Sequence, residues 1–206
     1  MNELSLSAGS FTGAQPIVGN FVGVSMEWST SVSYSSQPAF ATLLSQISPH
    51  PSIRVGGNSA DTTWWPEDGH DNNETCTNSY NNSVCCKTQI TAEGVATHAA
   101  LAKATDGTLT LDLNLLDASG AYALQEYTNI NSAIGSDSDF IEAFEIGNEP
   151  DLFYENGIRS PDYTLEDYMK DFDAAVAQLP AEAKLQGGTF CCNSDFAKAQ
   201  SDVINK

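Results

Sequence analysis

Apolar residues along this chain follow two different spacings. Short apolar or alternating runs, typical of strands buried in a sheet, occur at residues 20–26, 52–55, 109–115, 140–147 and 184–190. Segments predicted to be helical lie between or after them, at residues 38–47, 91–104, 121–134, 164–179 and 195–204. Thr91 and Thr164 stand where helix N-caps are expected. Because strands and helices alternate strictly, the pattern predicts an α/β protein with a parallel sheet.

Either an open doubly wound sheet or a barrel would satisfy this alternation. No GxGxxG turn follows the first predicted strand and no phosphate-binding loop occurs, which favours a barrel. The chain has 206 residues, whereas a complete (β/α)8 TIM barrel typically needs ~250. We therefore expect residues 16–206 to form about the first five β/α units of such a barrel. Residues 1–15 are predicted to hold a leading strand and linker that belong to another sheet.

Polar side chains follow each of the first four predicted strands at its C-terminal end. They are Glu27 and Trp28, Asn58 and Asp61, Asn114 and Asp117, and Asn148 and Glu149. In a (β/α) barrel these ends meet at one face, where catalytic groups lie. Carboxylates and amides bind sugar hydroxyls and aromatic rings stack on sugar faces, so the set is typical of a carbohydrate site. For Asn114 and Asp117 the pattern favours a structural role in the loops.

The segment Phe144–Asp151, with the sequence FEIGNEPD, carries the most specific chemistry. Its apolar strand ends at Gly147, and Pro150 is expected to push Glu149 toward an extended conformation. An amide and a carboxylate then lie side by side at a strand end. There a carboxylic acid can protonate a glycosidic oxygen while the amide holds a sugar hydroxyl. The alternative interpretation is a polar strand end that caps the following loop.

The rest of the chain offers few other chemical groups in a meaningful pattern. The three histidines share no spacing and no GxSxG elbow occurs, so acyl hydrolysis has no support. His98 is predicted to be structural or exposed. Arg54 lies inside a predicted strand, and a buried ion pair with Glu145 is expected to orient the site. We expect neither a metal nor a cofactor.

The chain is strongly acidic, with 27 acidic and 8 basic residues and a formal net charge of −19. Such a surface repels phosphate backbones and anionic lipids. Nucleic acid and membrane surfaces are therefore not expected as partners, and no stretch approaches the ~20 apolar residues of a membrane span.

Cysteines and glycosylation sequons indicate a secreted protein, although Met1-Asn2-Glu3 lacks the basic n-region of a signal peptide and no h-region follows it. The sequons Asn73-Glu74-Thr75 and Asn81-Asn82-Ser83 fall in one long loop predicted at residues 59–87. Cys76, Cys85 and Cys86 lie in the same loop, and Cys191 and Cys192 come near the end. Disulfides are favoured, with Cys76 paired to Cys85 or to Cys86, while free buried thiols remain the alternative.

Three segments of this chain, FVGVSMEW, SIRVGGNSAD and FEIGNEPDLF, resemble the strand ends of glycoside hydrolase family 79. That family contains β-glucuronidases and heparanase-like enzymes and belongs to the retaining clan A of glycosidases. The resemblance spans about residues 4–190. The Asn-Glu-Pro end is shared by the whole clan, whereas RVGGN and GVSMEW point to the family.

The resemblance implies roles for several residues. Glu149 matches the general acid/base, and Asn148 matches the residue that contacts the sugar 2-hydroxyl. Glu27 and Asn58 fall at positions similar to sugar contacts, and Trp28 lies beside them. The leading strand would join a C-terminal β-sandwich. The implied partner is a carbohydrate substrate, a glycan or glycoside that contains a β-glucuronide.

One feature of the resemblance argues against turnover by this chain alone. The nucleophile of the clan is a glutamate at the end of the seventh strand, and this chain reaches about the fifth. A retaining glycosidase needs two carboxyl groups about 5 Å apart. We therefore expect an N-terminal part of a β-glucuronidase-type hydrolase. The alternatives are a non-catalytic carbohydrate-binding or remnant barrel protein, and another clan A glycosidase such as a xylosidase, arabinosidase or glucosidase.

Overall fold

A five-stranded sheet forms the centre of the molecule. The computed structural model describes residues 19–65, 75–77, 83–85, 87–136, 138–187, 189–193 and 195–196. All five strands are parallel and lie in the order β1-β2-β7-β8-β9. Their bounds are β1 Gly23–Glu27, β2 Ser52–Gly56, β7 Thr108–Leu113, β8 Ile141–Ile146 and β9 Leu185–Gln186. The predicted α/β class and parallel sheet are thus confirmed.

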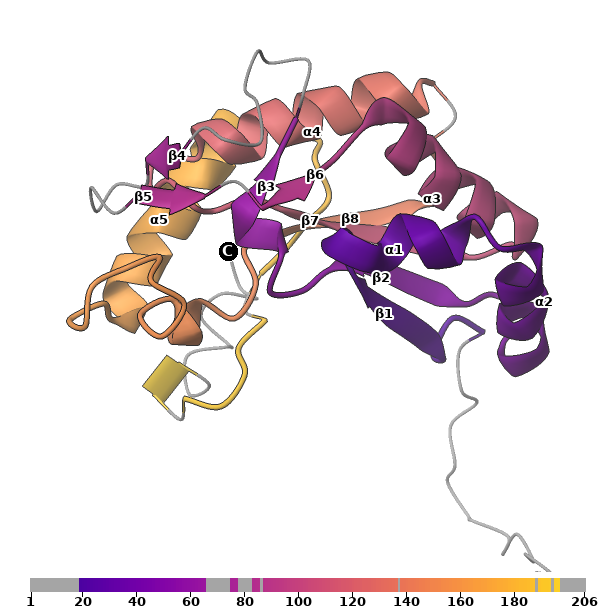
Figure 1. The fold of residues 1–206 in the computed structure, drawn as a ribbon, viewed down its shortest axis with the longest axis horizontal. Coiled ribbons are helices and arrows are strands. Elements are labelled where there is room, and N and C mark those ends of the chain that lie inside the picture. Colours follow the sequence, from indigo (N-terminus) through magenta and orange to yellow (C-terminus); the bar gives the residue numbers. More distant parts are fainter. Residues whose placement is uncertain are drawn as a thin grey trace, which may run out of the picture.

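The helices form one layer against the sheet. Their bounds are α1 Trp28–Ser35, α2 Pro38–Ile47, α3 Ala92–Ala104, α4 Ala121–Ile134 and α5 Leu165–Gln178. Helix α1 packs on α2 and α3, α3 packs on α4, and α4 packs on α5. In Figure 1, α1, α3 and α4 lie above β1 and β2. When successive strands are added in one direction with crossovers of one hand, the connecting helices all fall on the same side of the sheet.

The two faces of the sheet differ in polarity. The helix-facing side is apolar and joins the main hydrophobic core, with Ile53, Val55, Leu109, Leu111, Leu113, Phe144 and Ile146. The residues between them on each strand point the other way. On that side the register aligns Ser25 with Arg54, and Asp112 with Glu145 and Gln186. A polar row therefore crosses the sheet on the side away from the helices.

Most helix ends lie where the capping residues and glycines of the sequence predict them. The hydroxyl of Thr91 accepts from the backbone N–H of Gly94 at 3.0 Å and starts α3. Thr164 and Asp167 form a capping box at the start of α5. Helices α2 and α4 span the predicted residues, and Gly135 ends α4. These ends depend on residues within a few positions of one another.

The structure contains one helix that was not predicted, divides one predicted loop into short elements, and leaves two predicted segments undescribed. Helix α1 was not predicted, because its sequence WSTSVSYS is rich in serine and has no clear apolar face. The predicted loop at residues 59–87 contains the 3-10 turn Ala60–Thr62 and the short strands β3 Thr63–Trp64, β4 Thr75–Thr77 and β5 Ser83–Cys85. Strand β3 pairs with β6, Thr88–Gln89, and β4 pairs with β5. Residues 1–15 and most of the predicted helix 195–204 lie outside the described residues.

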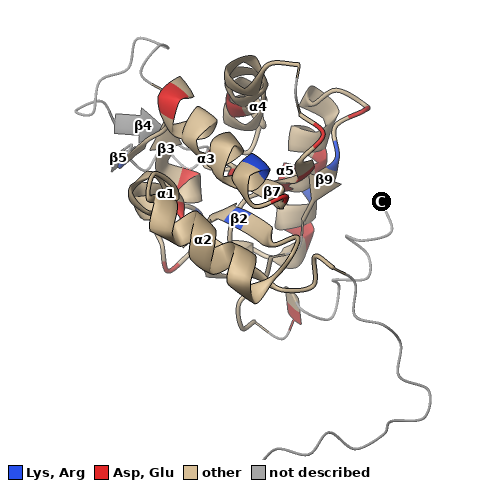
Figure 2. Cartoon of the chain, turned by 90° about the vertical axis from the view of Figure 1, so that its right-hand side faces the viewer, with Lys and Arg blue, Asp and Glu red and all other residues tan. Residues whose placement is uncertain are grey.

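Charge is distributed unevenly over the described elements. Acidic residues mark several helices and loops in Figure 2, whereas α1 and α2 carry none and also lack lysine and arginine. The exposed apolar side chains of this part include Tyr34, Leu43 and Ile47. In the described part of the chain, no helix is both long and apolar enough to cross a membrane.

Candidate functional site

The last residue of β1 and the loops after β2 and β8 meet at the C-terminal edge of the sheet, because all the strands run in the same direction. Asn58 follows β2 and Asn148 follows β8, and the Nδ2 of Asn148 donates to the Oδ1 of Asn58 at 3.2 Å. The backbone N–H of Asn58 donates to the Oε1 of Glu27 at 3.0 Å. The structure thus brings together three predicted site residues. We call Glu27, Asn58, Asn148 and the adjacent Glu149 the strand-end cluster.

The turn after β2 holds the carboxylate of Glu27. Its Oε2 accepts from the backbone N–H of Ser59 at 3.0 Å and from the Ser59 hydroxyl at 2.7 Å. Gly57 permits this close contact, since its φ is +78° and a Cβ there would lie 2.3 Å from the Oε1 of Glu27. Gly57 therefore serves the predicted purpose, which is to turn the chain sharply at the end of the strand, whereas Gly56 is still part of β2.

Arg54 binds the carboxylate of Glu145 on the polar side of the sheet. Its Nε donates to both carboxylate oxygens, at 3.1 and 3.0 Å, and its Nη2 hydrogen-bonds Oε1. Gln186 donates to the Oε2 of Glu145 at 2.9 Å. Arg54 also donates to the hydroxyl of Ser25 at 3.1 Å and to the Oδ2 of Asp112 at 3.4 Å. The predicted ion pair is confirmed, and its hydrogen bonds link all five strands of the sheet.

Asp112 is a second buried carboxyl group beside this ion pair. Burial raises the pKa of Asp112 well above its usual value, and the charges of Glu145 and Asp61 raise it further, whereas Arg54 lowers it. Its Oδ1 is buried and has no hydrogen-bond partner among the described residues. The raised pKa shifts Asp112 toward its neutral form, which reduces the negative charge buried beside the Arg54–Glu145 pair.

Three contacts fix the position and orientation of Asn148. Its Oδ1 accepts from the Nη2 of Arg54 at 2.9 Å, and its backbone N–H donates to the Oδ2 of Asp61 at 3.0 Å. A guanidinium group only donates, so the amide oxygen must face Arg54 and the amide nitrogen must face Asn58. The side chain beside Glu149 is therefore held in one orientation.

Asp61 connects the loops that follow β7 and β8. It is 2% exposed, and its Oδ1 accepts from the backbone N–H of Leu115 at 2.8 Å. Burial raises the pKa of Asp61 to about 6, against the lowering effect of the hydrogen bonds from Leu115 and Asn148. The sequence predicted a polar residue at this strand end. The structure shows a buried support for Asn148.

Glu149 follows Asn148 in a left-handed backbone conformation, with φ 49° and ψ 55°. The expected extended conformation before Pro150 is therefore wrong. The backbone explains this, since the N–H of Glu149 donates to the carbonyl of Thr189 at 3.0 Å and its own carbonyl accepts from Leu152 at 2.8 Å. Such conformations cost on the order of 1–3 kcal/mol and cluster at functional sites. The side chain is partly exposed.

Trp28 and the polar residues after β7 have structural contacts and do not join the strand-end cluster. Trp28 is 5% exposed and its indole N–H donates to the carbonyl of Asp112 at 3.0 Å. Asn114 is buried and hydrogen-bonds Thr63, and Asp117 accepts from the backbone N–H of Tyr122 at the start of α4. The structural role expected for Asn114 and Asp117 is confirmed. The buried Trp28 is not added to the strand-end cluster.

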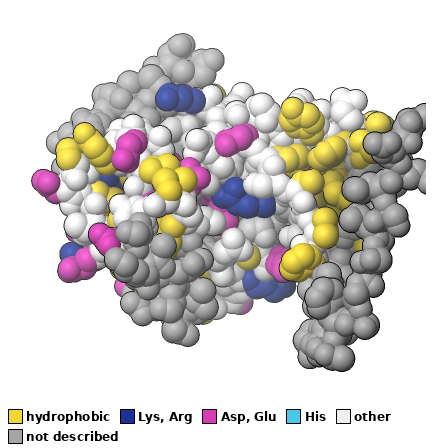
Figure 3. Space-filling view, turned by 90° about the horizontal axis from the view of Figure 1, so that it is seen from below, with side chains coloured by type: hydrophobic (Ala, Val, Ile, Leu, Met, Phe, Trp, Pro, Cys, Tyr) yellow, Lys and Arg dark blue, Asp and Glu magenta, His cyan; other side chains and the backbone are white. Residues whose placement is uncertain are grey.

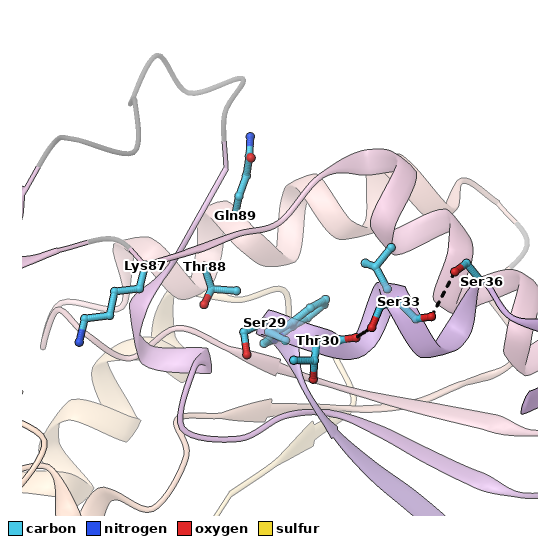
Figure 4. A pocket seen from close by; sticks show the side chains of 9 residues that line it. Ser29, Thr30, Ser33, Ser36, Lys87, Thr88 and Gln89 are labelled. Atoms are coloured by element: carbon cyan, nitrogen blue, oxygen red, sulfur yellow. Dashed lines mark hydrogen bonds between the residues drawn. The ribbon is translucent and has the colours of Figure 1, made fainter.

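A groove of about 460 Å³ lies between α1 and the β6 segment. Figure 4 shows its polar lining, with Ser29, Thr30 and Ser33 on α1 and Lys87 and Thr88 opposite. The hydroxyl of Ser33 donates to the carbonyl of Thr30 at 2.6 Å, so it is already used within the helix. The groove adjoins α1, and none of its lining residues belongs to the strand-end cluster.

The side of the sheet without helices presents mixed charges. Figure 3, which looks from below the view of Figure 1, shows basic and acidic side chains next to one another near the middle of this surface. The side chain of Arg54 is 23% exposed, whereas those of Asp112 and Glu145 are fully buried. No group of three or more metal-binding side chains occurs among the described residues.

The fold and the C-terminal edge of its sheet define an α/β protein whose parallel strands end in a cluster of carboxylates and amides. No protein-family model matches the chain, and no characterised protein matches its sequence.

Proposed function

We propose that the sheet is part of a (β/α)8 barrel. The sequential strand order and the single helical layer support this, because a doubly wound sheet has helices on both faces and a reversal of strand order. The polar row around Arg54 would face the barrel interior, and the strand-end cluster would lie at the catalytic face.

We propose that this chain carries the acid/base part of a retaining glycoside hydrolase of the β-glucuronidase type. The observation that carries the proposal is the connected strand-end cluster, in which a partly exposed carboxylate adjoins an amide of fixed orientation. Glu149 protonates the glycosidic oxygen and then deprotonates water, and Asn148 contacts the sugar 2-hydroxyl. Asn58 and Glu27 bind further hydroxyls. The substrate class rests on the resemblance to glycoside hydrolase family 79.

Neither of the other nearby glutamates is free to act as nucleophile. Glu145 accepts hydrogen bonds from Arg54 and Gln186, and its side chain is fully buried. Glu27 accepts from Asn58 and Ser59. The second carboxylate of a retaining mechanism is therefore not supplied by either of them.

The test uses the protein expressed from its complete transcript, with two aryl β-glucuronides that differ in leaving group. Glu149→Gln is expected to lower kcat/KM for the poor leaving group by roughly 10²–10⁴-fold, because that oxygen needs a proton to depart. The loss should be much smaller for an activated phenol. The matched control is Glu155→Gln, an exposed glutamate in the next loop, which should keep wild-type rates for both.

One result would contradict the role of Glu149, and two others would favour the alternative functions. An unchanged rate in Glu149→Gln would remove the acid/base assignment. Tight binding of a glucuronide by the wild type without any hydrolysis would favour the non-catalytic carbohydrate-binding alternative, and cleavage of another glycoside instead would favour another clan A activity.

A further inference from the structure

The segment Thr189–Asn193 lies alongside the loop that carries Glu149. The backbone N–H of Glu149 donates to the carbonyl of Thr189 at 3.0 Å, and the Thr189 hydroxyl donates to the carbonyl of Gly147 at 3.0 Å. The carboxylate of Asp151 accepts from three consecutive backbone N–H groups, those of Cys191, Cys192 and Asn193, at 3.0, 2.9 and 2.9 Å. Any change in the backbone of this segment therefore reaches the strand-end cluster directly.

Cys191 and Cys192 are consecutive, exposed and free as thiols. Interaction with the side chain of Cys192 is the largest cause of a raised pKa at Cys191, to about 11; loss of hydration and the charges of Cys192, Glu149 and Asp151 add to it. The thiolate of either cysteine is the form that attacks a disulfide. Two neighbouring thiols at the surface can be oxidised together, unlike a single exposed cysteine.

We propose that Cys191 and Cys192 form a vicinal dithiol that small-molecule disulfides oxidise reversibly to an intramolecular disulfide beside Glu149. One cysteine sulfur attacks the small disulfide, whose S–S bond breaks to give a mixed disulfide and one released thiol. The other cysteine then attacks the mixed disulfide, forms the Cys191–Cys192 bond and releases a second thiol. The two protein thiols are oxidised, the small disulfide is reduced, and both protons leave on the released thiols.

Ring closure acts on the hydrogen bonds of Asp151. The ring contains the peptide bond between the two cysteines, and the N–H of that peptide is the one that Cys192 donates to Asp151. Closing the ring restricts the orientation of this peptide. We expect the N–H groups of the segment to hydrogen-bond Asp151 less well in the oxidised form as a result. Any consequence for Glu149 as an acid/base rests on the proposed function, whereas the modification itself does not.

The test treats the folded chain with oxidised glutathione, blocks remaining thiols in denaturant, and measures the tryptic peptide Leu185–Lys198 by mass spectrometry. This peptide contains Cys191 and Cys192 and no other cysteine, while Cys76, Cys85 and Cys86 fall in a different tryptic peptide. We expect a loss of two hydrogen atoms from the peptide, restored by dithiothreitol. Amide exchange in the same peptide should be faster in the oxidised form, because donors to Asp151 are lost.

Single cysteine variants test the vicinal disulfide directly, without an activity assay. Cys192→Ser should give a glutathione adduct at Cys191 and no internal disulfide, and Cys191→Ser should give the reverse. Two glutathione adducts on the wild-type peptide, two unreacted thiols, or cross-links to the cysteines at residues 76–86 would each overturn the vicinal disulfide. Unchanged amide exchange after oxidation would overturn the coupling to Asp151.

Discussion

Single charged residues decide the geometry of this site, and Arg54 connects most of them. It joins Asp112 on β7, Glu145 on β8 and Asn148 just after β8. Buried charges are costly unless they are paired, so removing one partner leaves an uncompensated charge in the protein interior. The orientation of Asn148 depends on the same guanidinium group.

Replacing Arg54 by methionine is expected to lower the free energy of unfolding by about 3 kcal/mol, because Glu145 remains buried without its partner. Urea denaturation of the variant measures the change. The control Lys170→Met breaks an exposed pair with Glu166 and should stay within about 0.5 kcal/mol of the wild type. The double variant Arg54→Met, Glu145→Met should recover part of the lost stability. A double-mutant cycle that gives no coupling energy between Arg54 and Glu145 would contradict the ion pair as the cause.

His98 is expected to make the stability of the fold depend on pH. It is fully buried between the hydroxyls of Ser31 and Ser35, and burial lowers its pKa from 6.5 to about 4. The unfolded chain therefore binds the proton more readily than the folded chain. Stability is complete above pH 6.5 and is lost as the pH falls from 6.5 toward 4, with a slope of about 1.4 kcal/mol per pH unit.

The measurement compares denaturation of the wild type and His98→Gln between pH 4 and pH 7. The variant should lack the slope that His98 contributes. Asp61, whose pKa is raised to about 6, has the opposite effect and stabilises the fold as the pH falls below 6, so the difference between the two proteins isolates His98. Thr97→Ala on the same helix should keep the wild-type slope. Parallel curves for wild type and His98→Gln would refute the assignment.

At the scale of elements, the helix ends can be predicted from nearby residues, whereas the close packing of one helix on another cannot. The caps at Thr91 and Thr164 depend on hydrogen bonds to residues three positions away. The contact between α4 and α5 depends on Gly120, where a Cβ would lie 2.4 Å from the Cα of Ala175. No local signal in the sequence marks that glycine as a packing site.

Gly120→Ala should destabilise the fold more than Gly157→Ala. Both glycines have positive φ, at +76° and +72°, so both variants incur backbone strain of about 1–2 kcal/mol. Only Gly120 adds a clash with the backbone of α5, since a Cβ at Gly157 meets no atom within 4 Å. We expect Gly120→Ala to cost about 1–3 kcal/mol more. Equal melting temperatures for the two variants would disprove the packing explanation.

At the scale of the whole molecule, the sheet is apolar on one face and polar on the other. The helices cover the apolar face, and the Arg54 ion pair lies on the polar face. This division follows from the period of two along each strand, in which Arg54, Asp112 and Glu145 alternate with apolar residues. The pattern predicted the ion pair between Arg54 and Glu145 but gave no sign of Asp112 or Gln186 beside it.

The sequence by itself determined the alternating elements, the helix caps and the polar residues at the strand ends, because each depends on nearby residues and on the period of its own segment. Only the tertiary structure decided which of those polar residues meet. Asn148 is bound by Asp61, Asn58 and Arg54, from positions 87, 90 and 94 residues earlier in the chain. These contacts follow from strand order and register, which local patterns do not specify, and another long-range bond, from the N–H of Glu149 to the carbonyl of Thr189, helps to hold Glu149 in its left-handed conformation.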